Sequence, residues 1–525
     1  MALFTKLQSK LPKKRWKRIL LYAASSFFIL LAADMALTTY WRGFTISRET
    51  TYITAPLFPE GSPDYVTWLN QRWAQGVTPD NNAAVPLIKA IGMPQVGGSR
   101  NADWEARMWR GLGLPQTDAP GRILYFVTWA HDQTTNGGKN PGSATQPWIA
   151  NADPKWQDEE TKMYSAPWSA AEHPLWAQWL AAQPEVLALA HEAAGRERYY
   201  MPLFAREMPP HPGQTFATLL PTLGQTRYLG RMLLADAMMH ATQRGDAEKA
   251  AFLRDMNDVL RLGTLLRCEN SPLITNLVGT ALMQLACEDI CKAVVSGNLQ
   301  GDDARSLLAM MNALPPIPPL DLTGERCGLL DLWCSQAVYG LSRSPLAPTN
   351  QPKAAPLIAL LVPVRFESQL RLINQGQDQF EAAMRLPSYQ ARVSAVDAAQ
   401  RELYRRMNKA VLVFSGYQQT LSMLGDALWA SKACAIFQTE ATRRDLTRLA
   451  LALAIYHADK GNYPPTLDAL TGPSGILKEI PLDGFTDQPL LYRLDKTGYL
   501  LYSVGKDLHD DSGDADKDVI IRMER

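Results

Sequence analysis

The sequence predicts a mainly α-helical protein with a single N-terminal transmembrane helix, a large helical extracytoplasmic domain and a small α+β C-terminal domain. Three observations predict this class. An apolar stretch at 19–41 follows a basic start, apolar residues recur every three to four positions from about 172 to 440, and two strand-like runs lie within 489–505. Apolar residues at every third or fourth position are typical of amphipathic helices, and short β-rich runs bounded by turn residues are typical of strands.

The composition is that of a globular protein with a near-neutral total charge. The chain has 525 residues, of which 46% are hydrophobic and 20% are charged, and its net charge is +1. This balance excludes intrinsic disorder and a globally basic nucleic-acid-binding protein. The total conceals two local excesses, because residues 1–18 carry seven Lys or Arg and no acid, whereas 507–518 carry six Asp and one Lys.

The start of the chain, from position 1 to position 41, predicts a membrane anchor. Residues 1–18 form a basic cytoplasmic tail, and the apolar stretch at 19–41 includes one charge, Asp34. About 20 apolar residues cross a bilayer, and a basic flank stays in the cytoplasm. The alternative is a signal peptide cleaved after Ala33, but no clean A-x-A site is present, so an uncleaved signal anchor is favoured. We therefore expect a single-pass protein of the cytoplasmic (inner) membrane, with its N-terminus inside, its bulk in the periplasm and the lipid bilayer as a partner.

Residues 42–180 form a tryptophan-rich region with an irregular pattern. Eleven of the fourteen tryptophans lie in or next to it: Trp41, Trp68, Trp73, Trp104, Trp109, Trp129, Trp148, Trp156, Trp168, Trp176 and Trp179. Helices are expected at 63–76 and 81–92, the second with Asp80 as its N-cap. Exposed tryptophans would stack on sugars, but scattered ones without a repeating interval favour a role in the core.

Residues 181–440 predict a helical domain. Apolar residues at helical spacing continue to the proline-rich run at 314–320, which breaks helices and marks a joint. Further helices are expected at 365–386, 388–413 and 414–440.

The chain has six cysteines, five of them between 268 and 334. Buried thiols and one or two disulfides are both open, because pairing cannot be deduced from spacing. Cys287 and Cys291 are four residues apart on a predicted helix, but a zinc site there lacks a second ligand pair.

Residues 441–525 predict the small α+β module. A helix is expected at 443–461 with Gly461 as its cap, followed by two short strands within 489–505 that join around Lys496-Thr497-Gly498. The acidic segment and the apolar run at 519–523 close the module.

The order of motifs in this module resembles the globular domain of type II secretion major pseudopilins. The resemblance covers this module alone, and the matching positions are Tyr456, Ala458, Asp459, Gly461, Tyr463, Pro464, Leu467, Ala469, Leu470, Pro481, Asp483, Phe485, Tyr502, Ser503, Gly505 and Asp507. In that family the acidic C-terminal loop binds calcium, so the resemblance implies a calcium site here. The membrane helix expected here has no Gly-Phe-Thr-Leu-x-Glu junction like that of the family, and about 400 residues separate it from the module, so a polymerising pilus subunit is not expected.

A second resemblance lies near the front of the exported part. The run Asp80-Asn81-Asn82-Ala83-Ala84 after a short helix resembles uncharacterised anchored proteins of planctomycete-type bacteria. This resemblance implies no activity.

The acidic segment is the candidate metal site. Its six carboxylates belong to Asp507, Asp510, Asp511, Asp514, Asp516 and Asp518. Calcium takes six to eight oxygen ligands, which such a loop supplies through carboxylates and carbonyls. The spacing is not that of an EF-hand. A solvated acidic turn is the alternative, and His509 is expected at the surface because calcium is a hard ion.

Catalytic signatures are scarce in this sequence. The motifs G-x-S-x-G, H-E-x-x-H, the P-loop and G-x-G-x-x-G are absent. His191-Glu192 begins like a zincin helix, but Gly195 stands where the second histidine would be. No catalytic and no cofactor-binding residue is therefore predicted.

The sequence favours a non-enzymatic, membrane-anchored envelope protein. Its expected role is scaffolding, assembly or partner binding, with protein partners in the cell envelope and a link to secretion or pilus-like machinery. The alternative is an extracytoplasmic hydrolase or binder that acts on glycan or cell wall. A pocket lined by Trp148, Trp156 or Trp168 with two facing carboxylates would favour the alternative.

Overall fold

The computed structural model describes residues 26, 43–92, 102–116, 122–138, 154–204, 215, 222–243, 245–296, 301–339, 366–410, 417–473, 475–496 and 498–523. The predicted basic tail at 1–18 lies outside the described residues. The predicted transmembrane segment at 19–41 also lies outside them, apart from residue 26. Among the residues that are described, no helix has the length and apolar character needed to span a bilayer.

Fifteen helices and one three-stranded sheet make up the described part of the chain, so the prediction of a mainly helical protein is confirmed. The front of the chain forms short helices: α3 (Tyr65–Trp73), α4 (Ala84–Ile91), α5 (Ala102–Gly111), α6 (Phe126–Asn136), α7 (Lys155–Met163), α8 (Pro174–Ala181) and α9 (Pro184–Ala194). The rest of the chain forms mostly longer helices: α10 (Leu223–His240), α11 (Asp246–Leu266), α12 (Leu273–Val295), α13 (Gly301–Ala313), α14 (Thr323–Tyr339), α15 (Phe366–Met384), α16 (Tyr389–Ala410) and α17 (Tyr417–Lys460).

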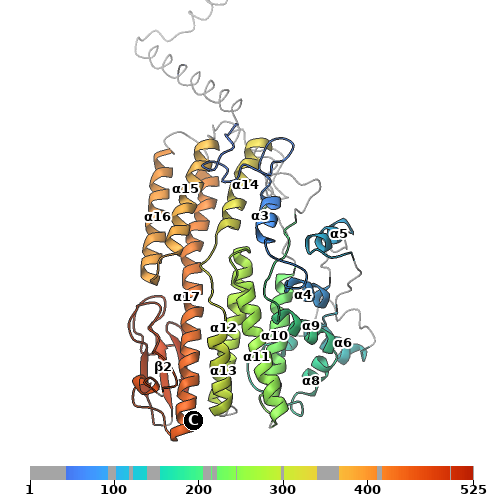
Figure 1. The fold of residues 1–525 in the computed structure, drawn as a ribbon, viewed down its shortest axis with the longest axis vertical. Helices are drawn as coiled ribbons and strands as arrows, with labels where there is room; N and C mark the ends of the chain where they lie inside the picture. Colours follow the sequence, from blue (N-terminus) through green and yellow to red (C-terminus); the bar gives the residue numbers. More distant parts are fainter. Residues whose placement is uncertain are drawn as a thin grey trace, which may run out of the picture.

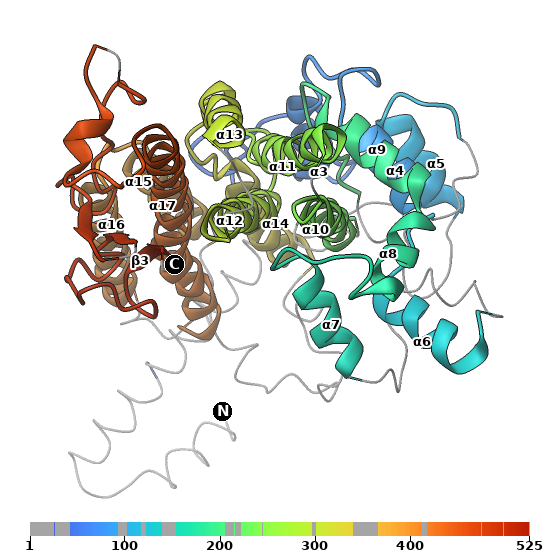
Figure 2. The same ribbon diagram turned by 90° about the horizontal axis from the view of Figure 1, so that it is seen from below.

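The central long helices lie side by side. Helix α10 packs on α11, α11 on α12, and both α12 and α13 on α17, an order that Figures 1 and 2 show from two directions. Helix α9 joins this row by packing on α10 and α11, and α4 packs on α9. On the other side of the molecule, α16 and the sheet both pack on α17 (Figure 1).

Helices α11 and α12 approach closely because two glycines face each other where they cross. A Cβ atom on Gly279 would lie 2.5 Å from the carbonyl oxygen of Gly263, and one on Gly263 would lie 2.4 Å from Cγ of Met283. Real Cβ contacts are much longer than this, so no larger residue fits either position without moving a helix. The crossing therefore fixes the last turn of α11, which carries Thr264.

The two helices expected near the front are present, with one correction. Helix α3 begins after Asp64, whose carboxylate caps its first turn at 3.0 Å. Helix α4 begins at Ala84, so Asp80 is not its N-cap. Instead the Asn82 side chain accepts a hydrogen bond from the Ala84 N–H and exchanges two hydrogen bonds with the backbone of Tyr200. An amide both donates and accepts, which a carboxylate cannot do.

Helix α17 unites the two helices expected at 414–440 and 443–461. No Gly or Pro interrupts the sequence between 426 and 460, so the helix continues through residue 440, where the C-terminal module was expected to begin. Its end is as predicted. Gly461 has a φ of +78° and donates its N–H to the carbonyl of His457 at 2.8 Å.

The C-terminal sheet has the order β1-β2-β3 and is antiparallel throughout. Strands β1 (Leu491–Leu494) and β2 (Tyr499–Ser503) confirm the predicted pair. The run at 519–523, for which no strand was predicted, forms β3 (Val519–Met523). Central strand β2 is buried along its whole length, and both β2 and β3 contact α17.

Asp483 ties the loop before the sheet to the end of β2. Its carboxylate is buried and accepts hydrogen bonds from the Ser503 hydroxyl at 2.8 Å, the Phe485 N–H at 2.9 Å and the Val504 N–H at 3.2 Å. Three of these residues belong to the pseudopilin-like pattern, so the structure brings widely spaced members of that pattern into contact.

Most of the described tryptophans are in the core, as expected. Seven of those in the tryptophan-rich region are buried and two are partly exposed: Trp73, Trp104, Trp109, Trp129, Trp168, Trp176 and Trp179, then Trp68 and Trp156. Trp41 and Trp148 lie outside the described residues.

All six cysteines are described and free, so no disulfide joins them; four are buried, as one interpretation expected, and Cys268 and Cys291 are partly exposed. Burial raises the pKa of Cys291 and of Cys434 to about 11. These thiols are therefore protonated at neutral pH and poorly reactive.

Candidate functional site

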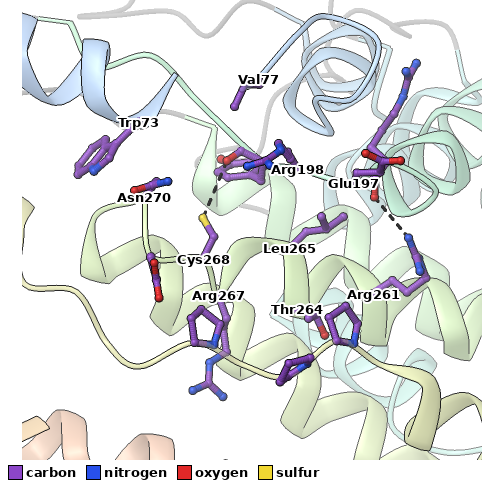
Figure 3. A pocket seen from close by; sticks show the side chains of 16 residues that line it. Trp73, Val77, Glu197, Arg198, Arg261, Thr264, Leu265, Arg267, Cys268 and Asn270 are labelled. Carbon is purple, nitrogen blue, oxygen red and sulfur yellow. Dashed lines mark hydrogen bonds between the residues drawn. The ribbon is translucent and has the colours of Figure 1, made fainter. Parts of the chain in front are cut away.

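An arginine-lined pocket opens where the end of α11 meets the segment after α9 (Figure 3). Its volume is about 570 Å³. Its walls come from the end of α3, the segment 196–199, the last turns of α11 with the residues that follow, and the prolines after α13. Four arginines and two glutamates line it: Arg196, Arg198, Arg261, Arg267, Glu197 and Glu269.

The segment 196–200 is held in place by the Asn82 run. Residues 82 and 198 form an isolated parallel bridge, with hydrogen bonds from the Arg198 N–H to the Asn81 carbonyl at 3.0 Å and from the Ala83 N–H to the Arg198 carbonyl at 2.8 Å. The run 80–84, noted in the sequence for its resemblance alone, therefore positions one wall of the pocket.

The arginines differ in how their charge is used. Arg261 donates to the carbonyls of Ala194 at 2.8 Å and Arg196 at 3.4 Å, and so satisfies the end of α9. Arg267 is buried and forms an ion pair with the fully buried Glu440 of α17. Arg198 is exposed, and within the described residues its guanidinium has no carboxylate partner. Arg198 is therefore the cation most available to a ligand.

The inner wall of the pocket is apolar, and the polar atoms of its two aromatic side chains are buried away from the opening. Trp73 and Tyr199 are buried, and neither the indole N–H of Trp73 nor the hydroxyl of Tyr199 has a hydrogen-bond partner among the described residues. Cys268 also lines the pocket, but burial raises its thiol pKa, so it is a poor nucleophile. The arrangement can bind a negatively charged ligand that also carries an apolar part.

The six aspartates predicted as calcium ligands lie in the loop between β2 and β3. Asp507, Asp510 and Asp514 are exposed, and each accepts a hydrogen bond from the backbone N–H two residues ahead. This is the Asx-turn geometry, in which a carboxylate caps its own backbone. Asp516 is also exposed.

The two remaining aspartates of this loop are less exposed. Asp511 pairs with Lys517 at 2.7 Å. Asp518 is buried and accepts the Gly513 N–H at 2.7 Å, while its other oxygen has no partner among the described residues. Within the described part of the chain, no three carboxylates of this loop lie within 4.8 Å of one another.

A second cluster of titratable groups lies between α9, α10 and α11, and the sequence did not predict it. Ligand atoms of Asp236, His240 and Asp255 lie within 4.8 Å of one another. Burial raises the pKa of Asp255 to about 7 and also raises that of Asp236. One feature of the sequence could have indicated this cluster: Asp236 and His240 are four residues apart on a helix that is otherwise largely apolar. Polar side chains on a buried helix face need partners, so such a pair indicates further polar residues nearby.

Comparisons of the chain with protein-family models, with curated proteins and with solved structures find no match.

Proposed function

We propose that this protein is a membrane-anchored envelope protein whose extracytoplasmic helical body binds an acidic segment of a protein partner in the arginine-lined pocket. The observation that carries the proposal is the pocket of Figure 3, with four arginines around an apolar wall. Arginine binds carboxylates in a fixed, bidentate geometry. The aromatic wall suits the apolar side chains of a peptide that alternates acidic and apolar residues.

Binding of a defined peptide tests this proposal. The probes are a short fluorescein-labelled peptide of alternating Glu and Leu and its Gln-Leu counterpart, measured by fluorescence anisotropy with the full chain in detergent. The Glu-Leu peptide should bind, and Arg198→Glu should weaken it at least tenfold, which corresponds to about 1.4 kcal/mol. The matched control is Arg110→Glu, a charge reversal at an exposed arginine of α5 that does not line the pocket. Equal binding of both peptides, or no effect of Arg198→Glu, would contradict the proposal.

The anchor and the location rest on the start of the chain. The basic tail at 1–18 and the apolar stretch at 19–41 support a single-pass protein with its N-terminus in the cytoplasm. The full chain should sediment with inner membranes, and protease added to the periplasmic side should digest it. A chain that lacks residues 1–41 should not be held in the membrane. Protection of residues 43–525 in intact spheroplasts would overturn this topology.

The C-terminal module supports a link to secretion or pilus-like machinery. The long helix with a small antiparallel sheet on its C-terminal half, and the hydrogen bonds that gather Asp483, Phe485 and Ser503, support the pseudopilin-like interpretation. We propose that its acidic loop binds calcium, with the unpartnered oxygen of Asp518 as one ligand. Calcium should raise the melting temperature, and Asp507→Ala with Asp514→Ala should abolish that shift. No shift in the parent chain would remove the calcium site.

A hydrolase that acts on glycan or cell wall is the second candidate. It is favoured by one observation, the presence of Glu197 and Glu269 beside Trp73 in the same pocket, since glycosidases need two carboxylates. The burial of Trp168 and most other tryptophans weighs against an aromatic sugar platform. Release of dye from labelled peptidoglycan that is lost in Glu197→Gln and in Glu269→Gln would support this candidate. No release by the parent chain would dismiss it.

A further inference from the structure

The cluster between α9, α10 and α11 combines two histidines with four carboxylates. Asp236 and His240 come from α10, His191 comes from the last turn of α9, and Glu248, Asp255 and Asp258 come from α11. It lies outside the arginine-lined pocket, whose walls include none of these residues.

The carboxylates form two sets, the outer pair Glu248 and Asp258 and the inner pair Asp236 and Asp255. Each histidine has one ring nitrogen hydrogen-bonded to an outer carboxylate. Nδ1 of His191 lies 2.8 Å from Asp258, and Nδ1 of His240 is hydrogen-bonded to Glu248. In metal centres, a ligating histidine usually donates its second ring N–H to a carboxylate, which fixes the ring and the tautomer. Both histidines of this cluster therefore have the orientation of metal ligands.

The other ring nitrogens face inner carboxylates at a distance too long for a hydrogen bond. Nε2 of His240 lies 3.6 Å from Asp236, and Nε2 of His191 lies 3.7 Å from Asp255. Two ligand atoms that are each about 2.1 Å from a tetrahedral zinc ion lie about 3.4 Å apart. The observed separations are thus close to the edge of a zinc coordination tetrahedron.

One inner oxygen is buried and unused. Arg254 binds Oδ1 of Asp255 at 2.8 Å, whereas Oδ2 has no partner among the described residues, and the Asp255 side chain is 0% exposed. The side chains of Asp236 and His240 are 10% and 18% exposed, so the cluster is also close enough to the surface for an ion to enter.

We propose that Asp236, His240 and Asp255 bind a divalent transition-metal ion, Zn²⁺ being the ion that this ligand set fits best. The imidazole ligand favours zinc over calcium or magnesium, which prefer oxygen alone. His191 is a further donor beside Asp255, and Glu248 and Asp258 hold the two imidazoles. The inference is independent of the proposed function, since it uses none of the residues of the arginine-lined pocket.

The alternative is an ion-pair network in which protonated histidines neutralise the carboxylates. Arg254 is the one permanent cation that contacts the inner carboxylates among the described residues. An ion-pair network has no affinity for zinc beyond that of any histidine-containing surface. Zinc binding that depends on the inner residues therefore separates the two interpretations.

The test uses the full chain in detergent after removal of metal with a chelator. Titration with Co²⁺ should give one equivalent of binding with the visible bands of tetrahedral cobalt, and Zn²⁺ should displace it and raise the melting temperature. Asp255→Asn and His240→Gln should lose these bands. His509→Gln, at an exposed histidine of the tail loop, is the matched control and should keep them.

A second variant keeps the test decisive if the inner variants fail to fold. Asp258→Asn retains all three inner ligands and the hydrogen bond to His191 in altered form, and should weaken zinc binding roughly 10- to 100-fold. Absence of stoichiometric Co²⁺ or Zn²⁺ binding by the parent chain would overturn the proposal. Zinc binding of equal strength in Asp258→Asn and, where they fold, in Asp255→Asn and His240→Gln would overturn it as well.

Discussion

The tail loop and the helical body both gather carboxylates, and they handle the negative charge in opposite ways. The loop between β2 and β3 places most of its aspartates in water, where backbone N–H groups and Lys517 satisfy them. The body buries Asp236, Asp255, Asp289 and Glu440 inside a helix bundle. A high density of aspartates along the sequence therefore does not predict where carboxylates converge in space.

The contrast teaches that burial decides the energetic weight of a charge. An exposed pair contributes about 0–1 kcal/mol, whereas breaking one partner of a buried pair costs about 3–5 kcal/mol. The same substitution should therefore lower the free energy of unfolding several-fold more in the helical body than in the tail loop.

The largest effect is expected from Arg267→Met. This change leaves Glu440, which is fully buried, without its partner between α11 and α17. The free energy of unfolding should fall by about 3–5 kcal/mol, measured by urea denaturation. The double variant Arg267→Met with Glu440→Met should recover most of this loss, because it removes both buried charges. A loss in the single variant no larger than that of an exposed pair would break the comparison.

Gly505→Ala tests the backbone that shapes the tail loop. Gly505 has a φ of +72°, and a Cβ atom there would lie 2.5 Å from the carbonyl oxygen of Lys517. Strain and clash together should lower the free energy of unfolding by about 2–3 kcal/mol. Gly461→Ala is the matched control, since Gly461 has a similar φ with nothing within 4 Å, and it should cost about 1 kcal/mol. Equal losses would show that Lys517 moves aside.

Asp289→Asn tests whether a buried carboxyl of the helical body makes the stability depend on pH. Burial raises the pKa of Asp289 to about 7, above the ordinary value of about 3.9. The stabilisation from its neutral form is fully present below about pH 4 and is lost as the pH rises through 7. The Asn variant has no such loss, so its stability relative to the parent should increase between pH 6 and 8, by roughly 1–2 kcal/mol. Thermal unfolding at both pH values measures the difference, and a pH-independent difference would contradict it.

The smallest effect is expected from Lys517→Met in the tail loop. Lys517 pairs with Asp511 at 2.7 Å, but its side chain is 53% exposed. Water and salt screen such a pair, so the free energy of unfolding in urea denaturation should change several-fold less than it does in Arg267→Met. A loss comparable with that of Arg267→Met would show that the ion pair of the loop contributes as much to stability as the buried ion pair of the body.

The helices and the first two strands could be predicted because their signals are local. Apolar spacing marked the long helices, Gly461 marked the end of α17, and the turn around 496–498 marked the β1–β2 pair. Strand β3 was missed because a run of five residues is too short to show a clear alternation of apolar and polar positions. Its pairing with β2, which the sequence does not reveal, makes it a strand.

Neither the arginine-lined pocket nor the histidine cluster could be predicted, because both depend on packing. Arg198 and Arg261 are far apart in the sequence, and α9 and α11 bring them to one opening. His191 meets Asp258 only because α9 packs on α11. The run 80–84 gave no hint of its role, since the partner of Asn82 is the backbone of a residue 118 positions away.

The length of α17 sets the distance between the C-terminal sheet and the opposite end of the molecule. Its 44 residues span about 66 Å at about 1.5 Å per residue. Thr45, near the first described residues, donates to Glu367 at the start of α15, at the opposite end of the molecule from the sheet (Figure 1). If the proposed anchor tethers the chain ahead of residue 43 and α17 stands upright on the bilayer, this helix would hold the acidic loop away from the membrane by about twice the ~30 Å hydrocarbon thickness. A partner that meets the loop must then reach that height above the lipid headgroups.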